Sequence, residues 1–310
     1  MNVVEISQLT YRYGRVTALR HVDFSVPQGA LYALLGPNGS GKTTLLQILA
    51  GLRRADSGRA SVMGIPVASL RTADRRRIGY VAEGQLLPGW MRLREVEAYL
   101  APLYDTWDES LARELCERFE LDPTRKIRTL SRGEQMKAAL LCALAPRPEL
   151  LVMDEPFTGM DALVKDALVR GLLESAGSEG WTVLACSHDI GELELLADWV
   201  GILDHGEMRV SEPMDVVRER FKHVDVMFSS DRAPAARRDF LPPNNWLSVE
   251  RSGSHVSFVL SCAVGESAEQ MIAAQFGGEA QVEMRNATLR ETFVALTKQR
   301  SGGAPQEVAA

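Results

Sequence analysis

The first residues that could do chemistry form a glycine-rich stretch that ends in a lysine and a threonine. Residues 36–43 read GPNGSGKT and match the pattern G-x-x-x-x-G-K-[ST]. They follow an apolar, strand-like run and precede TTLLQILAGL, whose apolar residues have helical spacing. In this context the glycines let backbone N–H groups and the positive helix end cradle a polyphosphate. Lys42 is expected to neutralise the β- and γ-phosphates, and Thr43 to ligate magnesium.

Two adjacent acids end a second apolar run, LLVMDE, at residues 150–155. A buried strand that ends in Asp154 and Glu155 beside a phosphate loop has a clear chemical use. Asp154 is expected to hold the magnesium shell, and Glu155 to act as the general base that polarises the attacking water. The alternative is a solvated Asp-Glu turn.

A histidine ends a third apolar run. WTVLACS leads into His188, and the carboxyl ends of parallel strands are where ligands bind in α/β sheets. His188 is therefore expected to donate a hydrogen bond to the γ-phosphate and the attacking water. A structural or surface histidine is the alternative.

The elements that must position these residues follow an α/β pattern. The start of the chain alternates as strands do, and residues from about Leu93 to Arg128 are rich in helical periodicity. The later apolar runs are typical of parallel strands covered by helices. From residue 221 to 298 the pattern changes to a small α+β region. The tail, 299–310, has too few large apolar residues to pack and is expected to be disordered.

Composition narrows the class of protein further. The chain of 310 residues has a net charge of -6, so it offers no general attraction for nucleic acids. Its four cysteines stand singly, without metal-ligand or disulfide spacing, which fits a reducing cytosolic compartment. No apolar run approaches the roughly 18 residues of a membrane span, and the start lacks the pattern of a secretory signal. A role at a membrane would need a partner.

With these features in this order, residues 3 to 215 resemble the ATP-binding cassette (ABC) family. The resemblance implies a P-loop NTPase cassette over residues 1–220, with a mixed sheet covered by helices on both faces and a helical insert at about 88–135. It implies ATP and Mg²⁺ as ligands, with Thr43 and Asp154 on the metal and Lys42, Glu155 and His188 as catalytic residues. The implied contacts from the loop are Gly36, Pro37, Asn38, Gly39, Ser40, Gly41, Lys42, Thr43 and Thr44.

Further family positions can be placed one at a time. Tyr13 matches the aromatic residue that stacks on adenine, with a core strand residue as the alternative. Residues 130–134, LSRGE, occupy the signature position where LSGGQ is usual, and Ser131 and Gly133 keep the parts that contact the nucleotide of a second cassette. Glu134 departs from the pattern. It also completes a capping box with Ser131, which is compatible with the signature role.

At two more positions the chain either differs from the family pattern or allows a second role for the residue. Glu83 stands where the family's γ-phosphate-sensing loop has glutamine, and the nearby Gln85 could serve instead. Asp161 is the acid retained in TGMD, where the family usually has SGLD. It could equally cap the helix that follows.

The implied function is that of an ATP-hydrolysing subunit that powers a separate transmembrane permease by dimer closure with a second cassette, either identical or different. Such a subunit would lie on the cytoplasmic face of the membrane, attached through the permease. The closing LRETFVALTK resembles the terminal helix of type-2 exporters and favours export. The stretch Leu86 to Trp107, with Trp90, could form the docking groove for the permease. The alternatives are a soluble or a regulatory cassette ATPase that is not coupled to transport.

Overall fold

The structure is a computed structural model. It describes residues 1–82, 84, 87–156, 181–187, 190–194, 197–228, 242–263, 266–276 and 280–298. The chain divides into two compact units, Met1–Asp189 with Leu195–Ser211, and Ile190–Glu194 with Glu212–Ala310. This division falls slightly before the boundary expected at residue 220. The tail predicted to be disordered, 299–310, lies outside the described residues.

The N-terminal part of the first unit is a four-stranded antiparallel sheet. Its strands are β1 (Asn2–Tyr13), β2 (Val16–Pro27), β4 (Ser57–Val62) and β5 (Ile65–Pro66), in the order β2-β1-β4-β5. Val4 of β1 pairs with Val26 of β2 and with Val62 of β4, so three buried valines lie in one row. This one-sided burial explains the alternation in the sequence.

A second sheet in this unit has its strands in the order β10-β9-β3-β8-β7-β6. The strands are β3 (Leu31–Leu35), β6 (Ile78–Val81), β7 (Leu150–Asp154), β8 (Thr182–Cys186), β9 (Trp199–Asp204) and β10 (Glu207–Pro213). Within the run β9-β3-β8-β7-β6, each pair of neighbouring strands is parallel. Leu34 pairs with Cys186 and Cys186 with Asp154, so the carboxyl ends of β3, β8 and β7 lie side by side.

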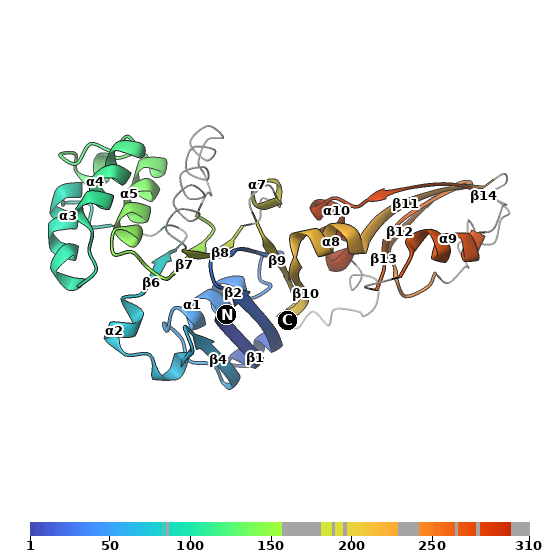
Figure 1. The fold of residues 1–310 in the computed structure, drawn as a ribbon, viewed down its shortest axis with the longest axis horizontal. Helices are drawn as coiled ribbons and strands as arrows, with labels where there is room; N and C mark the ends of the chain where they lie inside the picture. Colours follow the sequence, from blue (N-terminus) through green and yellow to red (C-terminus); the bar gives the residue numbers. More distant parts are fainter. Residues whose placement is uncertain are drawn as a thin grey trace, which may run out of the picture. The chain divides into compact units, whose positions relative to one another are not determined.

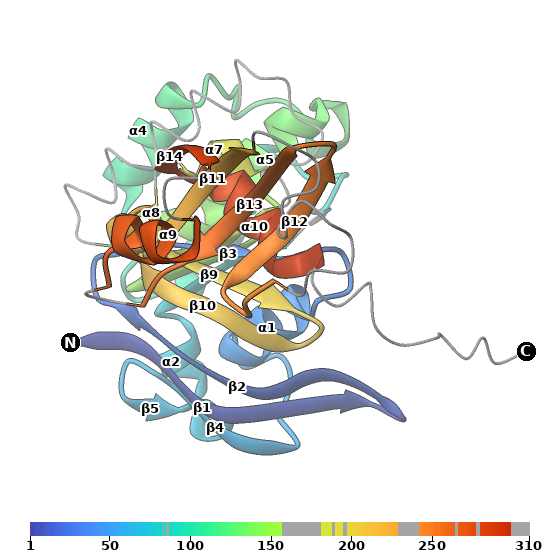
Figure 2. The ribbon, with the colours of Figure 1, turned by 90° about the vertical axis from the view of Figure 1, so that its right-hand side faces the viewer.

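Helix α1 (Lys42–Leu49) packs between the two sheets. It contacts β2 and β4 of the antiparallel sheet and β7 of the parallel one, and Figure 2 shows it above the antiparallel strands. Its residues Leu45, Leu46 and Leu49 are fully buried in a core cluster shared by both sheets. Burial of each such side chain stabilises the fold by roughly 2 kcal/mol. The first residues of α1 are thereby fixed at the end of β3.

Three of the described helices of the first unit gather beyond the edge strand β6 (Figure 1). They are α3 (Leu93–Leu100), α4 (Glu109–Arg118) and α5 (Arg132–Leu144), connected through 3-10 turns at Ala101–Leu103 and Ile127–Thr129. A further 3-10 turn at Val67–Ser69 and the one-turn α2 (Thr72–Arg75) lie between β5 and β6 in the sequence, and Figure 1 shows α2 apart from these three helices. Helix α5 contacts β6, α3 and α4. The α/β architecture inferred from the sequence is thus confirmed. Helices α3 and α4 and the start of α5 lie within the insert expected at about 88–135.

The second unit is an antiparallel sheet with helices. Its strands are β11 (Phe221–Phe228), β12 (Trp246–Ser252), β13 (His255–Ser261) and β14 (Ala280–Asn286), in the order β12-β13-β11-β14. Its helices are α7 (Ile190–Glu194), α8 (Met214–Arg220), α9 (Ala268–Phe276) and α10 (Leu289–Lys298). Val224 and Val226 of β11 share a core cluster with Ile272 of α9. The side chain of His223 lies on the other face of β11, and its Nδ1 is 3.4 Å from Oε1 of Glu291 in α10. Strand alternation therefore places α9 and α10 on opposite faces of the sheet.

Among the described residues, no helix combines the length and the apolar character needed to cross a membrane.

Candidate functional site

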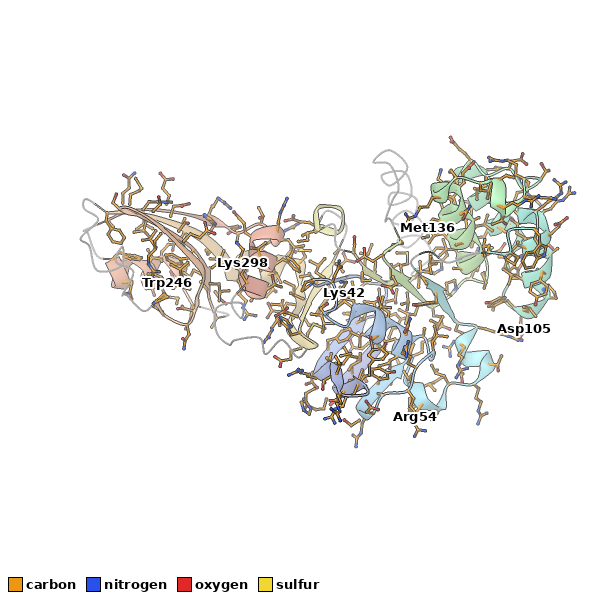
Figure 3. The ribbon with its side chains drawn as sticks, turned by 180° about the vertical axis from the view of Figure 1, so that it is seen from behind. Lys42, Arg54, Asp105, Met136, Trp246 and Lys298 are labelled. Carbon is orange, nitrogen blue, oxygen red and sulfur yellow. The ribbon has the colours of Figure 1, made fainter. Side chains whose placement is uncertain are left out.

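The predicted phosphate loop connects β3 to α1, and its lysine folds back into it. Lys42 Nζ donates hydrogen bonds to the carbonyl oxygens of Gly36, at 2.7 Å, and of Pro37, at 3.3 Å. The lysine is only 7% exposed, and Figure 3 labels it within the first unit. A buried ammonium among the amides at a helix start is suited to a polyphosphate anion.

Two glycines of the loop are required by their surroundings. Gly41 has φ +107, and a Cβ there would lie 2.5 Å from the carbonyl oxygen of Ala18. At Gly36 a Cβ would collide with the carbonyl oxygen of Leu203 and with Ser40 Oγ. Glycine is therefore required at Gly41 by both the backbone conformation and the space, and at Gly36 by the space alone. Ser40 is buried and its N–H donates to Pro37 O at 3.1 Å, while Asn38 and Gly39 are exposed at the loop tip.

The two predicted metal ligands meet at the start of α1. Thr43 Oγ1 donates a hydrogen bond to Asp154 Oδ1 at 3.2 Å. The two residues meet because Thr43 lies in the loop and helix that follow β3, Asp154 ends β7, and the carboxyl ends of both strands lie beside that of β8 at one edge of the sheet. Two ligands at right angles on one Mg²⁺, each 2.0–2.1 Å away, would be about 2.9 Å apart. A hydroxyl and a carboxylate are also the oxygen ligands that Mg²⁺ prefers. The pair therefore fits a shared magnesium ion.

A cysteine that the sequence did not single out contacts the same carboxylate. Cys186 Sγ donates to Asp154 Oδ1 at 2.8 Å, and both residues are buried. Burial, and then the neighbouring Asp154 charge, raise the pKa of the Cys186 thiol well above its ordinary value, so it remains a neutral donor. Its place follows from the register of β7 and β8, which pairs Asp154 with Cys186, and no local pattern in the sequence indicates that register.

Glu155 follows Asp154 with a left-handed backbone. Its φ is +51, and its N–H donates to Cys186 O at 3.1 Å. A non-glycine residue in this region is uncommon and costs about 1–3 kcal/mol, and such residues cluster at functional sites. The strand thus ends in a sharp turn at the acid predicted to be the general base.

Tyr13, the predicted adenine contact, lies at the end of β1 and beside α1. Its hydroxyl lies 3.2 Å from Thr44 Oγ1, within hydrogen-bond distance. The residue is 45% exposed, so the alternative of a core aromatic is wrong. Its ring is available next to the phosphate loop.

The signature segment forms the start of α5, as a capping box. Ser131 Oγ accepts from Glu134 N–H at 3.2 Å, and Glu134 Oε2 accepts from Ser131 N–H at 2.6 Å. Glu134 Oε1 also pairs with Arg125 at 2.6 Å. The backbone hydrogen bond from Ser131, followed by the Ser131 side chain and then Arg125, lowers the pKa of Glu134 below its ordinary value. The predicted capping box is confirmed. Glu134, the residue that differs from the family signature, forms an ion pair with Arg125, a partner that the sequence did not indicate.

Three predicted site residues, Glu83, His188 and Asp161, lie outside the described residues, as does Gln85, the alternative to Glu83. Their roles stay predictions.

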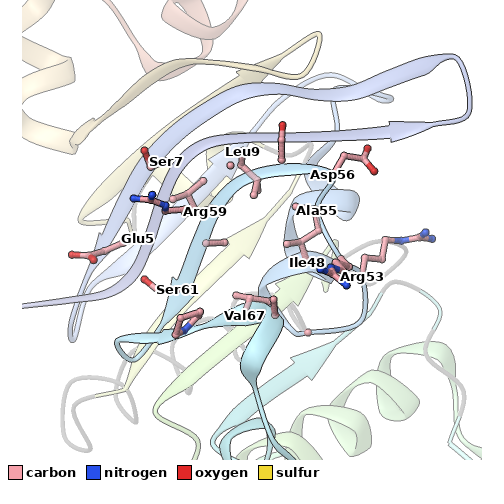
Figure 4. A pocket seen from close by; sticks show the side chains of 18 of the residues that line it. Glu5, Ser7, Leu9, Ile48, Arg53, Ala55, Asp56, Arg59, Ser61 and Val67 are labelled. Carbon is pink, nitrogen blue, oxygen red and sulfur yellow. The ribbon is translucent and has the colours of Figure 1, made fainter.

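A hollow of about 780 Å³ lies apart from the phosphate loop. It is bounded by β1, β4 and the segment after α1, and Figure 4 shows Arg53, Asp56 and Arg59 around it. Its lining includes no residue of the loop 36–43. Arg53 links it to Tyr13, since the Arg53 guanidinium lies 5.1 Å from the centre of the Tyr13 ring.

Comparisons with known proteins identify the family. The family model described as "ABC transporter" matches residues 19–158. The chain is 39% identical over 223 residues to the sulfate/thiosulfate import ATP-binding protein CysA of Xylella fastidiosa (strain 9a5c), covering 69% of this chain and 64% of that protein. It thus spans less than two thirds of that relative's length.

Two further matches cover more of the matched protein. CysA of Yersinia pseudotuberculosis (serotype I, strain IP32953) is 33% identical over 265 residues, covering 82% of this chain and 69% of that protein. The dimeric post-hydrolysis structure of the ATP-binding cassette MJ0796, bound to ADP and Pi, is similar in fold with a TM-score of 0.62 and 26% identity. That match covers 68% of this chain and 98% of the other.

Proposed function

This chain belongs to the ATP-binding cassette family of ABC transporters, and from that premise we propose that it binds and hydrolyses ATP to power transport through a separate transmembrane subunit. The observation that carries the proposal is the 3.2 Å contact between Thr43 Oγ1 and Asp154 Oδ1 at the mouth of the loop that buries Lys42. It joins the two halves of a magnesium nucleotide site across 111 residues of sequence.

The proposed reaction is in-line attack of water on the γ-phosphate. The amides of the loop and the Lys42 ammonium bind the phosphates and offset their charge. Thr43 and Asp154 would hold a Mg²⁺ ion, which would supply further positive charge beside the β- and γ-phosphates. Glu155 orients and deprotonates the water as the general base, and His188 hydrogen-bonds the γ-phosphate. Tyr13 stacks on the adenine.

The proposed working form is a dimer in which each signature segment closes on the nucleotide of the other cassette. Ser131 is exposed and sits at the N-terminus of α5, a position that suits an anion. The dimeric MJ0796 cassette bound to ADP and Pi supports this arrangement. Because Arg125 and the helix start balance the Glu134 charge, the acid does not by itself argue for an inactive half-site. Gly133, Asp161 and Glu83 complete the proposed nucleotide contacts.

The proposed membrane role rests on a partner. We place the chain at the cytoplasmic face of the membrane, docked on the transmembrane subunit through the exposed apolar side chains near α3. Trp90 is 75% exposed, and Tyr99 and Leu103 are exposed nearby. Exposed large apolar side chains that occur together mark interaction surfaces.

The direction of transport rests on fewer observations. The closing helix α10 favoured export in the sequence, whereas both CysA relatives carry import in their names. Reconstitution with the transmembrane subunit in vesicles, with ATP on one side only, distinguishes the two directions.

The testing experiment is Mg²⁺-dependent ATP hydrolysis by the purified chain and its Glu155→Gln variant, with oligomeric state followed by light scattering. Glu155→Gln should lose at least about 100-fold in turnover, as expected on removing a general base, and should form an ATP-dependent dimer. Glu149→Gln, an acid at the other end of β7 that pairs with Arg77, is the matched control and should keep its activity.

Two results would change the assignment. Rapid turnover by Glu155→Gln would assign the base to another residue. A wild-type chain that stays monomeric and inactive with ATP would favour the alternative of a regulatory cassette, or an obligatory partner subunit.

A further inference from the structure

Tyr13 belongs to a cluster of side chains that includes Tyr11 and Arg53. The two tyrosines are two residues apart on β1, and their ring centres lie 4.9 Å apart at an interplanar angle of 77°. Arg53 comes from the segment after α1, which Figure 4 shows beside the hollow. Its guanidinium lies 5.1 Å from the Tyr13 ring centre and 5.9 Å from that of Tyr11. Both distances are within the range of a cation–π contact.

The Arg53 guanidinium is itself held from two sides. Its Nη1 donates to the Tyr11 hydroxyl at 3.1 Å, and its Nε donates to Gln47 Oε1. Gln47 lies on α1, and Tyr11 on β1. The planar fork of an arginine can make two such bonds with fixed geometry, which the single ammonium of a lysine does not reproduce. The cation is therefore anchored to both elements that flank the nucleotide site.

Tyr13 is in turn restrained at several points. Arg53 lies over its ring, Tyr11 stands nearly perpendicular to it, and its hydroxyl lies 3.2 Å from Thr44 Oγ1. Even so, Tyr13 remains 45% exposed. A ring that is covered on one face by the cation and still has this exposure keeps a face open to a ligand.

We infer that Arg53 is a positioning residue for base recognition: it holds Tyr13 in the orientation that leaves one ring face open for the adenine. This inference rests on the proposed function, because it assumes that Tyr13 contacts the base. A side chain that is ordered before the ligand arrives spares the cost of ordering it at the moment of binding. Arg53 acts through Tyr13, and its contacts with Tyr11, Tyr13 and Gln47 include no residue of the phosphate loop 36–43.

The test compares a ligand that has the base with one that lacks it. Magnesium ADP and magnesium pyrophosphate are titrated calorimetrically into the wild-type chain and Arg53→Leu. Arg53→Leu is expected to bind ADP about 3- to 10-fold more weakly and to bind pyrophosphate as the wild type does. In steady-state hydrolysis it should raise KM for ATP by a similar factor, with little change in kcat. Arg53→Lys should bind ADP with intermediate affinity.

The matched control is Arg54→Leu, which removes the same charge one residue away. Arg54 is exposed and also borders the hollow, but the described contacts of the tyrosines do not include it. It should bind both ligands as the wild type does. Thermal melting of each variant checks that the fold is kept, and Tyr13→Ala should weaken ADP binding at least as much as Arg53→Leu.

The outcomes separate this inference from the proposed function. Unchanged ADP affinity in Arg53→Leu, or equal losses for ADP and pyrophosphate, overturns the positioning role while the cassette assignment stands. Unchanged ADP affinity in Tyr13→Ala removes the base contact, and the inference with it. A wild-type chain that binds neither ligand contradicts the proposed function itself.

Discussion

At the scale of single residues, charges that look unfavourable in sequence are balanced by contacts in space. Glu134 places an acid in the segment that is expected to meet a polyphosphate. In the fold its carboxylate accepts from the N–H of Ser131 and pairs with Arg125 at 2.6 Å. The negative charge is thus held at a helix N-terminus, where it is stabilising.

Removing Arg125 should expose this charge. Arg125→Gln is expected to raise the pKa of Glu134 part of the way toward its ordinary value, since the backbone bond from Ser131 remains. At neutral pH the unpaired carboxylate would repel the nucleotide of the facing cassette, so the ATP concentration needed for dimerisation in a Glu155→Gln background should rise several-fold. Light scattering against ATP concentration measures it. The double variant Arg125→Gln, Glu134→Gln should recover most of the loss, and no recovery would assign the effect of Arg125 to another contact.

At the scale of elements, helix α10 depends on a carboxylate at its first turn. Glu291 accepts from Thr288 N–H at 2.8 Å, Thr288 Oγ1 accepts from Glu291 N–H at 3.2 Å, and Arg285 of β14 donates two bonds to Glu291. The Arg285 bonds, followed by the Thr288 bonds, lower the pKa of Glu291 from 4.5 to about 2. A depressed folded-state pKa means that this stabilisation is present above pH 4.5 and is lost as the pH falls toward 2.

Glu291→Gln should therefore loosen α10 at neutral pH. Loss of a cap and a partly exposed ion pair is expected to cost about 1 kcal/mol, which corresponds to roughly fivefold faster amide exchange in residues 288–298. Hydrogen exchange with mass spectrometry measures this segment directly, and the difference from wild type should shrink as the pH approaches 2. Glu283→Gln, an exposed acid on β14, is the control. Equal exchange in wild type and Glu291→Gln at pH 7 would show that the cap does not stabilise the helix.

Elements differ in how far sequence could define them. The phosphate loop and the strand that ends at Asp154 were predictable from the sequence. The glycines of the loop, the apolar run of the strand and the acid at its end all stand within a few residues of one another, so local patterns indicate them. The capping box at Ser131 and Glu134 was local too, and it formed. The contacts of Arg53, Arg125 and Cys186 were not predictable, because each depends on which distant segment packs beside it: Arg53 on β1, Arg125 on the start of α5, and Cys186 on the register of β7 and β8.

At the scale of the whole molecule, a cassette that powers a membrane transporter would act through the surfaces by which it contacts other chains. Trp90, 75% exposed, follows the predicted γ-phosphate-sensing segment in sequence and precedes α3. The second unit has its own core around Trp246 and Phe258, whose rings stack with centres 3.9 Å apart. We propose that this unit regulates or stabilises the cassette dimer.

Trp90→Glu should weaken assembly with the transmembrane subunit while ATP binding by the isolated chain stays within about twofold. An exposed interface tryptophan typically contributes 2 kcal/mol or more, so co-purification should fall at least about tenfold. Pull-down of the complex from membranes measures it, with Leu52→Glu as the control, because Leu52 is also exposed but lies after α1. Intact assembly in Trp90→Glu would place the docking surface elsewhere.

The position of β3 in the parallel sheet also bears on how the chain is made. Its five buried residues pair only with β8 and β9 among the described strands, which a ribosome reaches about 150 residues later. At 5–20 residues per second, β3 waits on the order of 10 s for its first partner. Until then LYALL is an unpaired apolar edge of the kind that promotes aggregation. The strand that carries the phosphate loop therefore gains its hydrogen-bonded partners late in synthesis. Chaperone protection of the nascent chain matters most in the interval before they appear.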